Sequence, residues 1–343
     1  MLIILSEHVL LWVGVCSELC NMANFSIIIP VYNASATLDE CLKSIVDQTF
    51  HDYEVLLIDD GSSDDSVAIC SKYVEKFDFF SYRYQENAGV SAARNLGIKL
   101  AKNDLVVFVD SDDCVQPNFL ESLVCSVRKC SSHNSIVIHT VLFGSGSQWK
   151  KRNIHEGHFC GCGCVKEAVE HGLIDYSEPH SKVFFRKLLI EKQIYFPLGV
   201  KNGEDGIFIA KYLQYVDEII SHNEAIYIYR YYYNSASRRL YSTHDEWESF
   251  VLWKKELFFL FQKNRITDYA IAWKLLSIPF SRAIKAALSD NKYSLREKRR
   301  FLQNLPKECT LNYGSGRKYS MKGKVLKYLI NHRLWLPLVI LKR

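Results

Sequence analysis

Between residues 25 and 143 the chain alternates short runs rich in β-branched residues with stretches of helical periodicity, and this alternation limits the fold more than any other feature. Such repeats favour βαβ units and a largely parallel sheet. The expected strands are 26–30, 53–59, 79–85, 104–110 and 135–143, and the expected helices are 36–49, 64–76, 89–101 and 117–130. The sequence therefore predicts an α/β fold with helices on both faces of the sheet.

Polar residues gather where four of these strands end. The clusters are Tyr32-Asn33, Asp59-Asp60-Gly61-Ser62, Asn87-Ala88-Gly89 and Asp110-Ser111-Asp112-Asp113. In open sheets of this type, ligands bind at the carboxyl ends of the strands. We therefore expect the four loops to converge on a single crevice.

The last of these clusters places three carboxylates within four residues, directly after an apolar run. Carboxylates this close repel one another, and a bound cation would relieve the repulsion. Oxygen ligands on a short turn suit Mg²⁺ or Mn²⁺. The alternative is a solvated, Asp-rich turn in which one carboxylate caps the helix that follows.

The composition indicates a globular protein of one large domain or two smaller ones, because 48% of the 343 residues are hydrophobic. The 11 cysteines are scattered, which favours reduced thiols and a cytoplasmic location over disulfide bridges. One group stands apart, comprising His155, His158, Cys160, Cys162 and Cys164. Its spacing is not that of common zinc sites, so a soft-metal site and a Gly-rich loop with incidental thiols both stay open.

The two ends of the chain differ from the rest. Residues 1–22 are apolar but interrupted by Glu7 and His8, and we expect them to be an extension outside the fold, or a start codon assigned too early. The far end is basic, and no acidic residue follows Glu308. A basic, Trp-bearing amphipathic helix there would lie on an anionic membrane surface, or it would pack its apolar side on the protein. Nucleic acid is not an expected partner, because the charge is terminal and does not line a groove.

Four ordered motifs resemble family 2 glycosyltransferases with the GT-A (Rossmann-like) fold. They are Ser26-Ile-Ile-Ile-Pro-Val-Tyr-Asn33, Ile58-Asp-Asp-Gly-Ser-Ser-Asp64, Asn87-Ala-Gly-Val-Ser-Ala-Ala-Arg-Asn95 and Asp110-Ser-Asp-Asp113. The resemblance is weaker after residue 143, where Ser181-Lys182 and Gly203-Glu204-Asp205 look like acceptor-side elements. One departure is Ala88, where many relatives have a second glycine. A G-x-G-x-x-G motif does not follow the first strand, which counts against a dinucleotide oxidoreductase.

The resemblance implies a role for each matching residue. Tyr32 would lie against the nucleobase of a UDP-sugar, Asp60 would accept a hydrogen bond from it, and Arg94 would lie near the phosphates. Asp112 or Asp113 would bind Mn²⁺ or Mg²⁺, and Asp205 would be the catalytic base. The other implied nucleotide-sugar contacts are Pro30, Asn33, Asp59, Asn87, Gly89, Asp110 and Ser111, with Lys182, Glu204 and Arg238 as contacts to the diphosphate or the acceptor.

The implied activity is inverting, metal-dependent transfer of a hexose or N-acetylhexosamine from a UDP-sugar to a hydroxyl of a growing cell-surface glycan. The acceptor would be a lipid-linked glycan of a capsule, lipopolysaccharide or exopolysaccharide, met by a cytoplasmic enzyme at the membrane face. Two alternatives stay open, a sugar-phosphate nucleotidyltransferase and a non-catalytic nucleotide-sugar-binding subunit. The expected organisation is an extension (1–22), a nucleotide-sugar-binding half (23–143), an acceptor and catalytic-base region (144–240) and a helical C-terminal region (241–343).

Overall fold

The computed structural model describes residues 24–175, 177–231, 240–311 and 321–333. The strands are β1 (Phe25–Val31), β2 (Tyr53–Asp59), β3 (Phe80–Tyr84), β4 (Leu105–Phe108), β5 (Cys114–Val115), β6 (Ser135–Ser145), β7 (Gln148–Lys151), β8 (Gly157–Cys160), β9 (Lys182–Phe185) and β10 (Glu218–Arg230). The helices are α2 (Leu38–Val46), α3 (Ser66–Lys76), α4 (Val90–Leu100), α5 (Phe119–Val127), α6 (Cys164–Glu170), α7 (Arg186–Glu191), α8 (Glu204–Leu213), α9 (Thr243–Lys263), α10 (Tyr269–Ser289), α11 (Leu295–Gln303), α12 (Lys307–Leu311) and α13 (Met321–Asn331), with a short 3-10 helix η1 (Leu173–Asp175).

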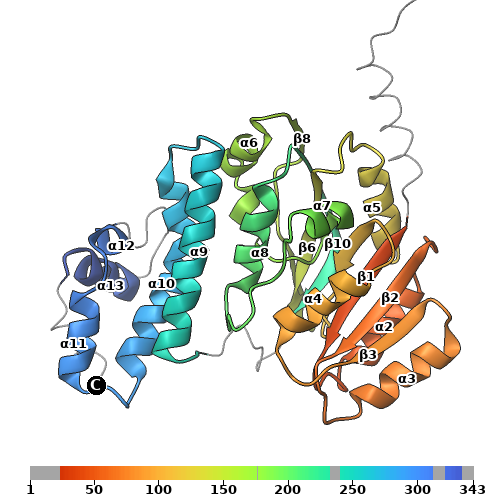
Figure 1. Cartoon of the computed structure of the whole chain (residues 1–343), viewed down its shortest axis with the longest axis horizontal. Helices are drawn as coiled ribbons and strands as arrows, with labels where there is room; N and C mark the ends of the chain where they lie inside the picture. Colours follow the sequence, from red (N-terminus) through yellow and green to blue (C-terminus); the bar gives the residue numbers. More distant parts are fainter. Residues whose placement is uncertain (1–23, 176, 232–239, 312–320, 334–343) are drawn as a thin grey trace, which may run out of the picture. The chain divides into compact units, whose positions relative to one another are not determined.

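The first four strands pair parallel, in the order β3-β2-β1-β4, and Figure 1 labels β3, β2 and β1 in this part of the sheet. All of β1 is buried, which explains why it reads as a continuous apolar run. Because parallel crossovers are right-handed, this order places α2 and α3 on one face and α4 on the other. The chain changes direction between β1 and β4, and this is the point where open α/β sheets bind ligands. The prediction of an α/β fold with helices on both faces is confirmed.

Close packing holds α4 against β1. Gly97 of α4 faces Ile28, and a Cβ at Gly97 would lie 2.3 Å from Ile28 Cγ2. Any larger residue would therefore lift the helix from the strand. Since α4 carries Arg94, this contact sets how far Arg94 lies from the end of β4.

The sheet continues with β9, β6, β10 and β5, where β6 and β10 are parallel to each other. β9, β5, β7 and β8 pair antiparallel with their neighbours. The sequence did not predict the strands that lie after residue 143, where β6 continues to Ser145 and both β7 and β8 follow. All four residues of β7 are exposed and only Phe159 of β8 is buried, so neither strand carries the hydrophobic alternation by which a strand is recognised.

The described residues form two compact units. The first unit lies within residues 1–198 and 212–233 and contains the sheet. The second lies within 199–211 and 234–343 and is helical, with a core in which the rings of Phe250 and Phe280 lie 5.1 Å apart. The domain boundaries expected from the sequence stay a prediction, although β6 to β10 extend the sheet of the first half well past residue 143.

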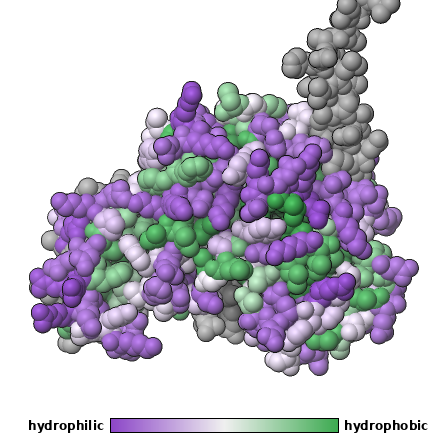
Figure 2. Space-filling view, viewed as in Figure 1, coloured by the Kyte–Doolittle hydropathy of each residue, from purple (hydrophilic) through white to green (hydrophobic). Residues whose placement is uncertain are grey.

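Figure 2 shows that hydrophilic side chains cover most of one face of the molecule, with apolar ones in smaller patches between them. Among the described helices, none is long and apolar enough to cross a membrane. The expected N-terminal extension, Arg238 and the last ten residues of the basic C-terminal segment lie outside the described residues.

Candidate functional site

Hydrogen bonds join the loops that follow β1 and β2. The Asn33 backbone N donates to Ser62 Oγ at 3.0 Å, and the Ser63 backbone N donates to Asn33 Oδ1 at 2.8 Å. Asn33 has a φ of 47°, a left-handed conformation that asparagine tolerates better than most residues. The neighbouring Tyr32 is 53% exposed, so its ring is available to a planar ligand.

Asp60 joins the loop after β2 to the loop before α4. Its Oδ1 accepts from Gln85 Nε2 at 2.7 Å and from the Ala88 backbone N at 2.8 Å. Its Oδ2 accepts from the Gly89 backbone N at 2.8 Å, where Gly89 has a φ of 90°. A carboxylate has about four acceptor positions. These donors occupy three of the four positions, so the Asp60 carboxylate is held in place. Its Oδ2 has one position left to accept a further hydrogen bond.

Asp59 lies directly before Asp60 and is fully buried. Its Oδ1 accepts from the Ser62 backbone N at 2.9 Å and its Oδ2 from Tyr82 Oη at 2.7 Å. Burial and the bond to Asp59 raise the pKa of Tyr82. The geometry gives Asp59 the role of holding the loop in shape.

Asp110 follows β4 and pairs with Arg94 of α4, with 2.8 Å between Arg94 Nη2 and Asp110 Oδ1. Burial alone would raise the pKa of Asp110, but the Arg94 guanidinium and His180 hold it below its usual range. The guanidinium also lies 5.1 Å from the centre of the Phe196 ring. The structure thus brings Arg94 to the acid cluster, where it holds Asp110 ionised.

Asp113 is fully buried and is anchored to β10. Its Oδ2 accepts from Tyr227 Oη at 2.8 Å and its Oδ1 from the Arg230 backbone N at 2.9 Å. Tyr227 Oη in turn accepts from the Asp110 backbone N at 3.1 Å. Burial, followed by the charges of Asp110 and Asp112, raises the pKa of Asp113 to about 8. Both oxygens of Asp113 are therefore engaged with the protein, and Tyr227 links the two ends of the turn.

Asp112 lies between these two residues and is partly exposed. Burial, followed by the charge of the nearby Asp110 carboxylate, raises its pKa to about 6. Arg230 Nε of β10 donates to the Asp112 backbone O at 2.7 Å and so holds the backbone of the turn. The carboxylate oxygens of Asp112 and Asp110 suit a hard divalent cation, because a cation would offset this repulsion. Of the two predicted metal ligands, Asp112 is better placed than Asp113.

The remaining predicted residues lie in different local environments. Pro30 is buried in β1, and the Ser111 backbone O accepts from Thr37 Oγ1 at 3.1 Å. Asn87 Nδ2 donates to the Asp60 backbone O at 2.9 Å. Lys182 is buried in β9, where its Nζ donates to the Glu178 backbone O at 2.6 Å.

Asp205 and Glu204 lie in the first turn of α8, within the second unit. Close packing fixes this turn, since a Cβ at Gly206 would lie 2.3 Å from Trp253 Cζ2. The preceding Gly203 has a φ of 90°. Because both positions are glycine, the Trp253 ring of α9 packs directly against the turn that contains Glu204 and Asp205.

Sequence reasoning did not find Tyr227 as a partner of the acid turn, nor the contacts of Arg230 and Gly206. Tyr227, Tyr229 and Tyr231 occupy every second position at the end of β10, and this period of two is typical of a strand. A surface cavity of about 420 Å³ lies elsewhere, lined by Ser131, Ser132, His133, Asn134, Lys187, Leu188 and Glu191. It contains none of the predicted site residues.

Residues 26–190 match the model of the family described as Glycosyl transferase family 2. Glycosyltransferase GlyA of Streptococcus pneumoniae is 32% identical over 228 residues, which are 62% of this chain and 31% of GlyA. The chain thus spans about a third of the length of that relative. The solved structure of S. aureus TarS 1-349 in complex with UDP-GlcNAc has a TM-score of 0.66 and 21% identity, covering 91% of each chain. The mannosyltransferase PcManGT of Pyrobaculum calidifontis, in complex with GDP-Man and Mn²⁺, has a TM-score of 0.52 and 14% identity, covering 97% of this chain and 92% of its own. At these identities the solved structures show the GT-A fold alone.

Proposed function

Because residues 26–190 match the model of glycosyl transferase family 2, we propose that this chain is a glycosyltransferase that moves a hexose or N-acetylhexosamine from a UDP-sugar to a hydroxyl of a growing cell-surface glycan. The observation that carries the proposal is the joined network of strand-end loops at the point between β1 and β4 where the chain changes direction. This network presents an exposed aromatic ring, a fixed acceptor and paired carboxylates at one edge of the sheet.

The donor nucleotide would bind to the first two of these features. The Tyr32 ring would stack on the uracil, and Asp60 Oδ2 would accept a hydrogen bond from a uracil N–H group. Two backbone N–H groups and Gln85 hold the Asp60 carboxylate in place before the ligand arrives, so little ordering is needed on binding. Of the two solved structures compared, TarS is in complex with UDP-GlcNAc and PcManGT with GDP-Man, and the proposal of a UDP-sugar follows TarS, the more similar of the two.

The diphosphate would lie beside Asp110 and Asp112. Their oxygens would hold Mn²⁺ or Mg²⁺, and a cation bound there stabilises the negative charge that develops on the leaving UDP. Arg94 keeps Asp110 ionised and in position, while Tyr227 and Arg230 hold the turn from β10. The solved PcManGT structure contains Mn²⁺ with its nucleotide-sugar, which supports a metal in this fold.

Asp205 would be the catalytic base. A hydroxyl is a weak nucleophile until a positioned carboxylate accepts its proton as the new bond forms. A single displacement of this kind inverts the anomeric carbon, so an α-linked UDP-sugar gives a β-linked product. Lys182, Glu204 and Arg238 are proposed contacts to the diphosphate or the acceptor, and a lipid-linked acceptor would bring the enzyme to the cytoplasmic face of a membrane.

Thermal unfolding of the whole chain with UDP-, GDP- and dTDP-sugars, each with and without Mn²⁺, tests the proposal. A ligand at 100 times its Kd stabilises the folded state by about 2.7 kcal/mol, so a specific donor produces a clear rise in Tm. We expect a rise with one UDP-sugar that depends on Mn²⁺, together with release of UDP when acceptor is present. The absence of a rise with every nucleotide-sugar would contradict the proposal, and release of pyrophosphate from UTP and a sugar 1-phosphate, supplied in a separate reaction, would indicate a nucleotidyltransferase instead.

A further inference from the structure

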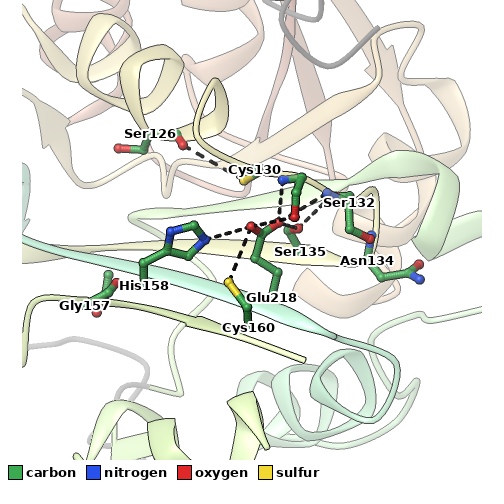
Figure 3. A network of polar contacts seen from close by, with 11 residues as sticks. Ser126, Cys130, Ser132, Asn134, Ser135, Gly157, His158, Cys160 and Glu218 are labelled. Carbon is green, nitrogen blue, oxygen red and sulfur yellow. Dashed lines mark hydrogen bonds and ion pairs between the residues drawn. The ribbon is translucent and has the colours of Figure 1, made fainter. Parts of the chain in front are cut away.

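The start of β10 and the strand β8 bring together three side chains that the proposed transfer does not use. His158 and Cys160 are two residues apart on β8, so they lie on the same face of the sheet. β8 pairs antiparallel with β10, where Glu218 lies opposite Cys160 and Ile220 opposite His158. Figure 3 shows the side chains of His158, Cys160 and Glu218 pointing toward one another.

The donor atoms of these side chains are close to one another. His158 Nε2 lies 2.7 Å from Glu218 Oε1, and Cys160 Sγ lies 4.0 Å from the same oxygen. All three donor atoms lie within 4.8 Å of one another. In a tetrahedral zinc site, bonds of about 2.0–2.3 Å place the ligand atoms about 3.3–3.8 Å apart. Shifts of about 1 Å or less would convert the observed cluster into such a site.

A network of hydrogen bonds fixes Glu218, which is almost fully buried. Its Oε2 accepts from the Ser131 backbone N at 2.8 Å and from Ser135 Oγ at 2.6 Å, and Oε1 faces His158 and Cys160 (Figure 3). Outer contacts of this kind orient a carboxylate before a metal binds.

The surroundings of Cys160 are negative. The carboxylates of Glu218, Asp217 and Glu167 are the charged groups that act on the Cys160 thiol. The same negative charges favour a cation, which would bind the thiolate directly.

We propose that His158, Cys160 and Glu218 bind one zinc ion. A set of one nitrogen, one sulfur and one oxygen ligand suits Zn²⁺ better than Mg²⁺ or Ca²⁺, which take oxygen ligands almost exclusively. Three protein ligands leave one position of the tetrahedron for water or for a further residue. The proposal stands apart from the proposed function, since it uses none of the residues of the donor site.

The site would clamp the edge strand β8 onto β10. Tyr227, which holds the acid turn, is nine positions along β10 from Glu218, or at most roughly 30 Å of extended strand. The zinc would therefore stabilise the strand that supports the acid turn, at a distance from the transfer itself. Metal at this site is expected to raise the Tm of the whole protein.

Zinc content and Co²⁺ absorption of the full chain test the proposal, with the protein kept reduced by a phosphine and stripped of metal before titration. We expect one tightly bound zinc per chain and, with Co²⁺, a sulfur-to-metal charge-transfer band in the near ultraviolet. Cys160→Ser should remove the band, and His158→Gln should weaken zinc binding at least tenfold. The matched control is Cys125→Ser, which changes an exposed cysteine of α5 and should leave both readouts unchanged.

Two further measurements separate this site from the acid turn and from misfolding. Asp112→Asn should keep the bound zinc, because Asp112 belongs to the candidate donor site. Zinc should raise the Tm of the stripped wild-type protein and leave that of Cys160→Ser unchanged, a result that requires both proteins to be folded. Wild-type protein without a charge-transfer band, or zinc binding that Cys160→Ser leaves intact, would overturn the proposal.

Discussion

The role of Tyr227 leads to a sharp prediction, because its hydroxyl lies between two residues of the acid turn. Tyr227→Phe removes the bond to Asp113 Oδ2 at 2.8 Å and the bond from the Asp110 backbone N at 3.1 Å, while the buried ring stays in place. Each intramolecular hydrogen bond contributes about 0.5–1.5 kcal/mol, and this change removes two of them. We therefore expect a loss of about 2 kcal/mol in the free energy of unfolding, or roughly 4–8 °C in Tm.

The same change should weaken the metal site. With the link between its ends removed, the turn from Asp110 to Asp113 is free to shift, and a misplacement of about 1 Å costs about a hundredfold in a positioned reaction. Kinetics of UDP release at increasing Mn²⁺ concentration measure this effect. We expect Tyr227→Phe to need several times more Mn²⁺ for half-maximal rate and to have a lower kcat.

Tyr73→Phe is the matched control. Tyr73 of α3 is also buried, and its hydroxyl donates to the Asp39 backbone O at 3.1 Å, away from the acid turn. The Tyr73→Phe substitution should lower Tm without changing how the rate of UDP release depends on Mn²⁺. If Tyr227→Phe has the Tm and Mn²⁺ dependence of the wild type, then β10 does not support the acid turn and the reasoning is wrong.

Three more predictions follow from other parts of the structure. Asp205→Asn should abolish transfer and leave UDP binding intact by calorimetry, whereas loss of both would show that Asp205 is structural. Gly206→Ala should lower the free energy of unfolding by about 1–3 kcal/mol, because its Cβ would lie 2.3 Å from Trp253 Cζ2, and adding Trp253→Leu should recover part of the loss in thermal unfolding. Burial and the neighbouring His222 lower the pKa of His139 from 6.5 to about 3, so the unfolded chain takes up a proton below pH 6.5 that the folded chain does not. The contribution of His139 to the free energy of unfolding should therefore be complete above pH 6.5 and about 2 kcal/mol smaller at pH 5. In denaturant unfolding, the free energy of His139→Gln should fall less between these pH values than that of the wild type.

The first half of the fold could be predicted from the sequence because β1 and β4 are buried along their whole length and β2 is buried at all but one residue. Buried parallel strands such as β2 read as continuous β-branched and apolar runs, and the predicted strand 53–59 has the bounds that the structure shows. The polar clusters at the strand ends pointed to one crevice for the same reason, since a parallel order puts those ends together. β7 and β8 were missed because their side chains are mostly exposed.

The partners of the acid turn could not be predicted, because they come from distant parts of the chain. Asp113 and Tyr227 are 114 residues apart, and the pairing of β10 with β5 brings them together. β10 also contains register shifts between His222 and Ala225 and between Ala225 and Tyr227, which decide the face that each later side chain occupies. A local sequence pattern does not reveal such shifts.

Because β10 anchors Asp113, the acid turn can complete its folding only late in synthesis. During synthesis the motifs up to residue 113 leave the ribosome first, and more than a hundred residues must follow before Tyr227 and Arg230 emerge to meet Asp113. Contacts this distant in sequence form late in folding, since the closure of a long loop comes before any gain from the contact. A nascent chain would therefore hold three closely spaced acids without their supporting strand, and it would gain a finished acid turn only when the first unit is complete.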